Sequence, residues 1–318
     1  MKPAFLNRIF FFLILILIIP LAVSCASKGA LKAEEYFSIG MAYYELGQSN
    51  QANRERYFQE AERWLNRARA ADKTMTASDY NLGRLAFENA RYEEASRSFE
   101  RILAKDPANI MALKAAAYSR IMNGNLDLAE AHYGKVLELV PESADDGYNY
   151  ALVLFGMKKY KKSEEVLNRY PHALEENAAS ILLLARVQKA QDKVEAVDSY
   201  AKWIVIANSP PAQGIYEYAQ VLENAGLFAK AIEYYGEAAK AMRTDTDDLK
   251  KSAIIFDEAR LLLSADPLND AGIEKLSSAV TEGFSDQEAI RELLLDERIS
   301  AENKAEIKTI LESFAENI

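Results

Sequence analysis

The residue types that most often carry out chemistry are scarce in this chain. Its 318 residues include two histidines, His132 and His172, and a single cysteine, Cys25. Neither histidine has a cysteine or a second histidine at the spacing of a metal site, so we predict that both are surface residues. The sequence contains no G-x-S-x-G, Walker or H-E-x-x-H motif. We therefore expect no enzymatic activity, no metal and no cofactor.

Aromatic side chains are the other group that could act, because they are the usual anchors of a binding surface. The chain holds 17 tyrosines and 13 phenylalanines. Whether these rings gather on one surface depends on the elements that carry them.

Two helical patterns meet in the stretch from residue 78 to 107. Apolar or small residues spaced three and four apart form a stripe on a helix, and each pattern has one: Leu82, Gly83 and Ala86, then Ala95, Phe99 and Ile102. Residues 89–91 are the turn between the helices, and Pro107 ends the second one. A single hairpin cannot bury both stripes, so it needs copies stacked against it.

The copies are present at a spacing of 33 to 35 residues. A small residue recurs at Ala61, Ala95, Ala129, Ser163, Ala196 and Ala231. A bulky residue follows each by four positions, at Leu65, Phe99, Tyr133, Leu167, Tyr200 and Tyr235. A small side chain lets the two helices of a hairpin approach closely, where a leucine would overpack.

This helix–turn–helix period of about 34 residues resembles the tetratricopeptide repeat (TPR) family. The resemblance implies an all-α, right-handed solenoid of about six repeats, which we place at residues 33–245. A polar insertion over residues 48–56 delays the second helix of repeat one and is expected to lengthen that helix or its loop. Residues 246–318 leave the period, and we expect them to form helices that cap the last open face. A capping box at Ser285 and a cap at Ser300 predict two of these helix starts.

The N-terminus resembles a bacterial lipoprotein signal peptide. Lys2 and Arg8 precede an unbroken apolar run over residues 9–19, and small residues then lead to Cys25. The resemblance implies that residues 1–24 are removed, that Cys25 is lipidated and that residues 25–32 form a tether. Ala26, where an aspartate could stand, favours the outer membrane by the same resemblance, with the chain facing the periplasm. An uncleaved membrane anchor is the alternative, but the run is shorter than the roughly 20 residues that span a bilayer.

The charge balance limits the partners. Loss of Lys2 and Arg8 with the leader would change the net charge from −10 to −12, which disfavours nucleic acid. One segment of this acidic chain is basic, with arginines at positions 54, 56, 63, 67 and 69. Two interpretations are open: a solvated helix face with internal ion pairs, or a surface for anionic lipid head groups near the anchor.

In the TPR family the first helix of each repeat lines a concave groove. Carried over to this sequence, the groove positions are Phe37, Met41, Tyr44, Tyr80, Arg84, Phe87, Lys114, Tyr118, Tyr148, Asn149, Phe155 and Tyr216. The alternative is that several of these rings pack between repeats. Lys114 and Asn149 also fit the carboxylate clamp of some TPR proteins, but Tyr118, Ala178 and Leu182 break that pattern, so we do not expect a clamp.

The sequence thus predicts a membrane-tethered TPR scaffold that binds a segment of another envelope protein in an aromatic groove. The alternative is an accessory lipoprotein of a solute transport system that partners a periplasmic binding protein. An enclosed apolar pocket would favour the accessory, and an open groove the scaffold.

Overall fold

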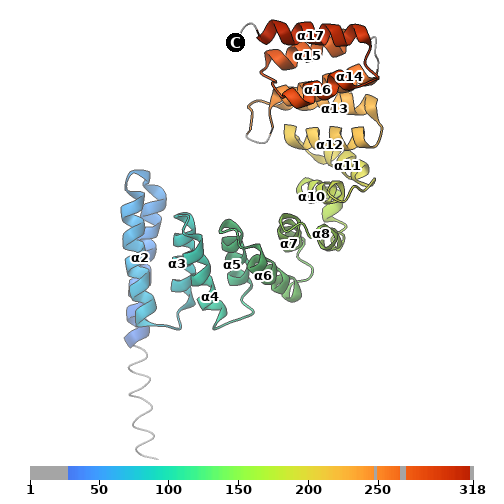
Figure 1. Cartoon of the computed structure of the whole chain (residues 1–318). Helices are drawn as coiled ribbons and strands as arrows, with labels where there is room; N and C mark the ends of the chain where they lie inside the picture. The colour runs from blue at the N-terminus through green and yellow to red at the C-terminus, as the bar shows by residue number, and fades with distance from the viewer. Residues whose placement is uncertain (1–27, 247–248, 266–269, 316–318) are drawn as a thin grey trace, which may run out of the picture. The chain divides into compact units, whose positions relative to one another are not determined.

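The computed structural model describes residues 28–246, 249–265 and 270–315, and the described chain is all α (Figure 1). The leader, Cys25 and residues 25–27 of the predicted tether lie outside these ranges. Within them, no helix combines the length and the apolar character needed to cross a bilayer.

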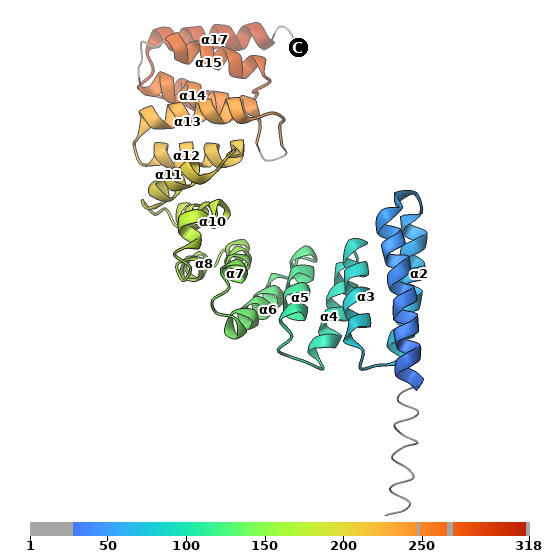
Figure 2. The same cartoon turned by 180° about the vertical axis from the view of Figure 1, so that it is seen from behind.

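The chain forms two compact units, residues 28–157 and residues 158–315 of the described part. Unit 1 holds an N-terminal helix (residues 28–49), η1 (Gln51–Asn53), α2 (Arg54–Ala71), α3 (Thr76–Glu88), α4 (Tyr92–Leu103), α5 (Ile110–Met122), α6 (Leu126–Leu139) and α7 (Ala144–Gly156). Unit 2 holds α8 (Tyr160–Leu167), α9 (Ala173–Glu176), α10 (Ala178–Lys189), α11 (Ala196–Ile206), α12 (Ala212–Asn224), α13 (Phe228–Ala241), α14 (Lys251–Ala265), α15 (Asp270–Thr281), α16 (Gln287–Leu295) and α17 (Ala301–Ala315). In each unit, successive helices pack as antiparallel neighbours in a stack (Figures 1 and 2).

Burial confirms the predicted register. The six small positions, from Ala61 to Ala231, are at most 1% exposed, and the six bulky positions, from Leu65 to Tyr235, are at most 4% exposed. The helices meet so closely that a Cβ built on Gly83 would lie 2.7 Å from the ring of Phe99. The pairs of small and large residues therefore set the distance between the helices of each hairpin.

A left-handed residue follows the first helix of five successive repeats. It recurs every 34 residues, with positive φ at Ala90, Gly124, Lys158, Asp192 and Gly226. Only glycine adopts this conformation without steric cost, so three of the five turns carry strain. The bond from the amide of Arg91 to the carbonyl of Ala86, at 2.9 Å, shows why the geometry is kept: it satisfies a carbonyl at the helix end.

The polar insertion in repeat one is helical. The N-terminal helix runs to residue 49 and α2 spans 18 residues, so the insertion lengthens both helices of the hairpin. It also places Phe58 against Tyr44, with ring centroids 5.6 Å apart. The lengthened hairpin therefore differs from the others at its turn end.

The C-terminal helices begin close to the predicted positions. Ser300 accepts a bond from the amide of Asn303 at 3.1 Å, as expected of a cap. The cap of α16 is Asp286 and not the predicted Ser285, because the Asp286 carboxylate accepts from the amides of Glu288 and Ala289. The carboxylate can reach both of these amides, and it is negatively charged beside the positive end of the helix dipole.

Helices α14 and α15 form a further hairpin of the same kind. Gly272 lies against Leu263, with an ideal Cβ 2.7 Å from that side chain, and Leu276 four residues later is fully buried. This pair repeats the small and large pattern 41 residues after Ala231 and Tyr235. The predicted domain boundaries at residues 24, 32 and 245 stay predictions.

Candidate binding surface

Four of the predicted groove residues gather in one hollow of unit 1. Tyr80, Arg84 and Phe87 of α3 and Tyr118 of α5 line a recess of about 200 Å³ that opens to solvent. Its remaining wall comes from Glu88, Phe99, Ala115 and Ser119. We name this recess the aromatic hollow.

The rings of the aromatic hollow are ordered by contacts with one another. Phe87 stacks on Tyr118 with centroids 5.1 Å apart, and Tyr80 lies edge-on to the core residue Phe99 at 5.6 Å. Tyr118 is 51% exposed, so one face of its ring is open to a ligand. A ring that is held by a neighbour loses little freedom on binding, which favours its use as an anchor.

Arg84 supplies the positive charge of the aromatic hollow. Its guanidinium donates to the hydroxyl of Tyr44 at 2.9 Å and lies 5.1 Å from the centre of that ring. Among the residues that the structure describes, no carboxylate forms an ion pair with it. The side chain is exposed, so its charge is available to an anionic group of a ligand.

Tyr44 supports Arg84 from below the surface and is not an exposed groove residue. Its side chain is 4% exposed and stacks on Phe58. Its hydroxyl donates to Glu88 and accepts from Gln48 and Arg84. Burial, and then the neighbouring Glu88 carboxylate, raise the pKa of Tyr44, which keeps the hydroxyl protonated.

The other predicted groove residues of unit 1 lie outside the aromatic hollow. Phe37, Met41, Tyr148, Asn149 and Phe155 are half-buried on the N-terminal helix and α7. Lys114 forms an ion pair with the buried Asp146 at 2.6 Å. Its charge is therefore engaged by the protein itself, which the groove position of Lys114 did not predict.

Tyr216 lies in unit 2, where the same face of the first helices is ionic. Its hydroxyl donates to Asp257 at 2.7 Å, and burial raises the pKa of Tyr216. Neighbouring first helices are joined by Arg186 with Glu217 and by Glu223 with Arg260, each at 2.8 Å. Arg186 and Glu217 lie 102 residues, or three periods, after Arg84 and Ala115 of unit 1, where Arg84 donates to the Tyr44 hydroxyl. The contact of Phe87 with Tyr118 corresponds in the same way to Lys189 with Gln220, where the lysine Nζ donates to the amide oxygen at 2.7 Å. The two units thus use equivalent positions for different chemistry.

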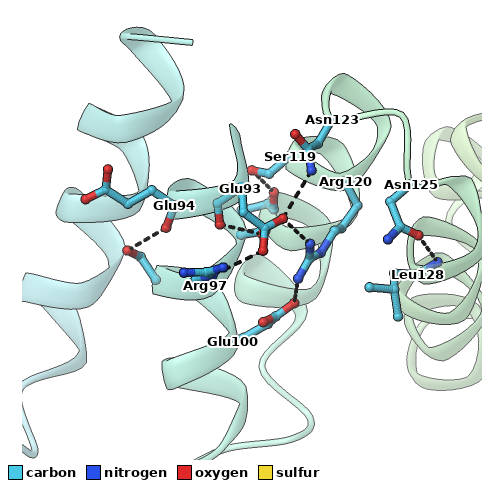
Figure 3. Close-up of polar contacts among 12 residues, drawn as sticks. Glu93, Glu94, Arg97, Glu100, Ser119, Arg120, Asn123, Asn125 and Leu128 are labelled. Atoms are coloured by element: carbon cyan, nitrogen blue, oxygen red, sulfur yellow. Dashed lines mark hydrogen bonds and ion pairs between the residues drawn. The ribbon is translucent and has the colours of Figure 1, made fainter. Parts of the chain in front are cut away.

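Sequence reasoning missed a polar cluster between repeats two and three. Arg120 of α5 is 9% exposed and bonds Glu93 at 2.5 Å and Glu100 at 2.6 Å, while Asn123 donates to Glu93 at 3.1 Å (Figure 3). Arg97 approaches Glu93 from the solvent side at 3.1 Å. The carboxylates come from α4 and the guanidinium from α5, so no pattern within one helix predicts the cluster.

The prediction that both histidines are surface residues is wrong for His132. Its Nε2 is buried without a hydrogen-bond partner in the described structure, and burial lowers the pKa of His132. It lies one position before the bulky Tyr133, so α6 turns part of its ring inward. His172 is 96% exposed at its side chain. No group of three or more metal-binding side chains gathers in the described ranges.

Comparison with protein-family models and with curated proteins finds no match for the sequence. Solved structures are similar in fold. A tetratricopeptide repeat protein from Parabacteroides merdae has a TM-score of 0.56 at 18% identity, over 83% of this chain and 98% of its own. PilF of Pseudomonas aeruginosa has a TM-score of 0.52 at 17% identity, over 70% of this chain and 97% of its own. With the confirmed 34-residue register, these likenesses show that the chain has the all-α solenoid fold of the tetratricopeptide repeat proteins.

Proposed function

We propose that this chain is a membrane-tethered scaffold that binds a segment of a partner protein in the aromatic hollow of unit 1. The observation that supports this most is the pairing of an exposed ring, Tyr118, with the Arg84 guanidinium in one recess. Exposed aromatic residues and arginine are the residue types that dominate binding energies at interfaces. The partner would be another protein of the bacterial envelope, and no nucleic acid.

The chemistry of the aromatic hollow suggests what the bound segment presents. A recess of about 200 Å³ admits one large apolar side chain against Phe87 and Tyr118. The Arg84 guanidinium beside it can bond a carboxylate in two places. We infer a segment with an aromatic or large aliphatic residue next to an acidic group.

The openness of the aromatic hollow favours a protein segment over a small solute. A solute-transport accessory was expected to enclose an apolar pocket, and a small ligand needs most of its surface covered. The aromatic hollow opens to solvent, and Met122, four residues after Tyr118 on α5, adds an apolar side chain that is 43% exposed. An extended chain could therefore run across it.

The tether belongs to the same proposal. Lipidation of Cys25 would hold the chain on a membrane, and the sequence favours the outer membrane with the protein facing the periplasm. Replacement of Cys25 with alanine should leave the chain unprocessed or release it from membranes. Metabolic labelling with a fatty acid measures lipidation directly. Equal labelling of the native chain and the Cys25→Ala variant would contradict the tether.

Crosslinking in native membranes tests the binding surface. Tyr118→Ala and Arg84→Gln should each abolish crosslinks to a specific partner while leaving helicity unchanged. Phe228→Ala and Arg56→Gln are matched controls, because both residues are exposed and lie outside the aromatic hollow. If the hollow variants keep the crosslinks that the controls keep, binding occurs elsewhere. A variant that loses its circular dichroism signal would show that the ring is structural.

A further inference from the structure

One end of unit 1 lies directly beside the start of the described chain. Residues 28 and 29 open the N-terminal helix, and an ideal Cβ on Gly29 would be 3.2 Å from the carbonyl oxygen of Ala71, at the end of α2. The connections α2–α3 and α4–α5 lie at this same end of the unit (Figures 1 and 2). The described chain therefore begins at this end of unit 1.

This end carries a concentration of positive charge. We name as the basic edge the residues Lys28, Lys32, Arg69, Lys73, Arg101 and Lys105, which come from the first turns of the N-terminal helix and from the ends of α2 and α4. Lys28, Lys32 and Lys73 are exposed.

Three cations of the basic edge are fixed around one buried carboxylate. Asp79 is 1% exposed and pairs with Arg101 at 2.8 Å, with Lys105 at 3.2 Å and with Arg69 at 3.8 Å. Asp79 neutralises one of the three, and Asp72 and Asp106 lie in the same connections, beside Lys73 and Lys105. The six cations of the basic edge against these three carboxylates leave a net charge of three positive units. Each of the three cationic side chains is 35% to 41% exposed, so the excess charge reaches solvent in a held arrangement. Asp79 thus holds the three cationic side chains in place at the surface.

The charge reverses in the next repeat along the chain. The connection from α6 to α7 is flanked by Glu138, Glu142, Asp145 and Asp146. The whole chain has a net charge of −10, so the positive potential is local to the two repeats nearest the chain start. Solubility alone would not require this separation of signs.

We propose that the basic edge contacts the membrane and binds the phosphates of anionic lipid head groups, which fixes the direction in which unit 1 points from the bilayer. The inference rests on the tether of the proposed function. Lys28 is three residues from Cys25, at most about 11 Å of extended chain, which is close to the screening length of about 8–10 Å at physiological salt. Each lysine or arginine held this near an anionic surface strengthens the contact about fivefold.

The orientation has a consequence for the aromatic hollow. α3 starts at the basic edge, so Phe87 and Glu88 in its last turn lie at the opposite end of that helix. With the basic edge on the bilayer, that part of the hollow faces away from the lipid. A partner could then reach it without displacing the head groups.

Fluorescence quenching on vesicles tests the basic edge. The lipidated full chain carries a fluorophore at Ala104→Cys, an exposed site beside Lys105. It is reconstituted in vesicles of phosphatidylcholine alone or with 30% phosphatidylglycerol, each holding a lipid with a quencher on its head group. We expect stronger quenching with phosphatidylglycerol, and we expect 0.5 M salt to remove the difference. Lys32→Glu with Lys73→Glu should lower the contact equilibrium at least about 25-fold. Lys161→Glu with Lys202→Glu, which makes the same charge change on exposed residues of unit 2, should not.

Equal quenching in the two vesicle types, or equal loss in the control variant, would overturn the proposal. Whether Cys25 is lipidated is measured separately, by co-flotation with vesicles of phosphatidylcholine. A chain without the lipid does not co-float with these vesicles. The basic edge is then judged by co-flotation with phosphatidylglycerol vesicles, which the Lys32 and Lys73 variant must lose. Partner capture through Tyr118 and Arg84 is scored by crosslinking and depends on neither result.

Discussion

Replacement of Arg120 with methionine is expected to lower the free energy of unfolding by about 2 kcal/mol. The Arg120 side chain is 9% exposed and bonds both Glu93 and Glu100 across the junction of repeats two and three (Figure 3). Methionine keeps the unbranched stem in place, so the cavity left behind is small. The loss therefore comes from the two carboxylates, which keep their charge and lose their partner.

The magnitude follows from how much water reaches those carboxylates. Loss of one partner of a fully buried ion pair costs about 3–5 kcal/mol, whereas an exposed pair contributes about 0–1 kcal/mol. The side chains of Glu93 and Glu100 are 43% and 36% exposed, so water takes over part of the interaction. The expected cost lies between the two limits.

Arg97→Met is the matched control, because Arg97 bonds the same Glu93 but is 68% exposed. Urea unfolding followed by circular dichroism should show a change below about 1 kcal/mol for the control. Adding Glu93→Gln and Glu100→Gln to Arg120→Met should restore most of the lost stability, because no uncompensated charge is left at the junction.

A second readout separates electrostatics from packing. The Arg120 charge contributes to the lowered pKa of His132, after burial. Arg120→Met should therefore raise the pKa of His132, which a proton NMR titration of a chain with two histidines can follow. If Arg120→Met and Arg97→Met are equally stable, and the pKa of His132 does not move, the cluster has no special role at this junction.

Three further predictions concern the repeat core, the turns and pH. Phe99→Ala should cost about 3–5 kcal/mol in urea unfolding, because the ring is 2% exposed and packs on Gly83; a neutral result would mean that the register is wrong. Ala90→Gly should stabilise the chain by about 1 kcal/mol by relieving the positive φ of 55°, while Ala70→Gly, at an exposed helical site, should destabilise it by about 0.5–1 kcal/mol. Burial lowers the pKa of His132, so the unfolded chain binds a proton at this ring more readily than the folded chain does. The free energy of unfolding therefore has its full contribution from the neutral ring above about pH 6.5, and this contribution is lost as the pH falls towards the folded-state pKa. His132→Gln should flatten the dependence of the melting temperature on pH in that range, and the exposed control His172→Gln should leave it unchanged.

The packing register could be predicted from the sequence because packing itself imposes the spacing. A small residue opposite a bulky one is required wherever two helices of a hairpin approach closely, so Ala95 and Phe99 repeat along the chain. The left-handed residues of the turns could be predicted only in part. The left-handed position recurs every 34 residues, but Lys158 and Asp192 occupy it as well as glycine, so residue type alone does not mark it.

The binding surface could be predicted less well because it depends on which side chains meet across repeats. Tyr44 occupies a groove position by register, yet the lengthened first hairpin brings Phe58 onto its ring and buries it. Lys114 is likewise a groove residue by register, and Asp146 from the next repeat engages its charge. Neither partner is near in sequence. A register map therefore identifies which positions face a surface, but not which of them stay open.

The two units show how one repeat can serve different purposes at equivalent positions. In unit 2, Arg186 stands three periods after Arg84 and forms an ion pair with Glu217. The charge of Arg186 is therefore already neutralised within the chain and is not available to a ligand. In unit 1, the contact of Phe87 with Tyr118 leaves one ring face open, and Arg84 bonds a neutral hydroxyl instead of a carboxylate. A paired charge loses its partner when it binds something else, whereas an open ring and a guanidinium on a phenol lose little. On this ground we propose unit 1 as the part of the chain that binds the partner, with the basic edge at the opposite end of α3 from Phe87.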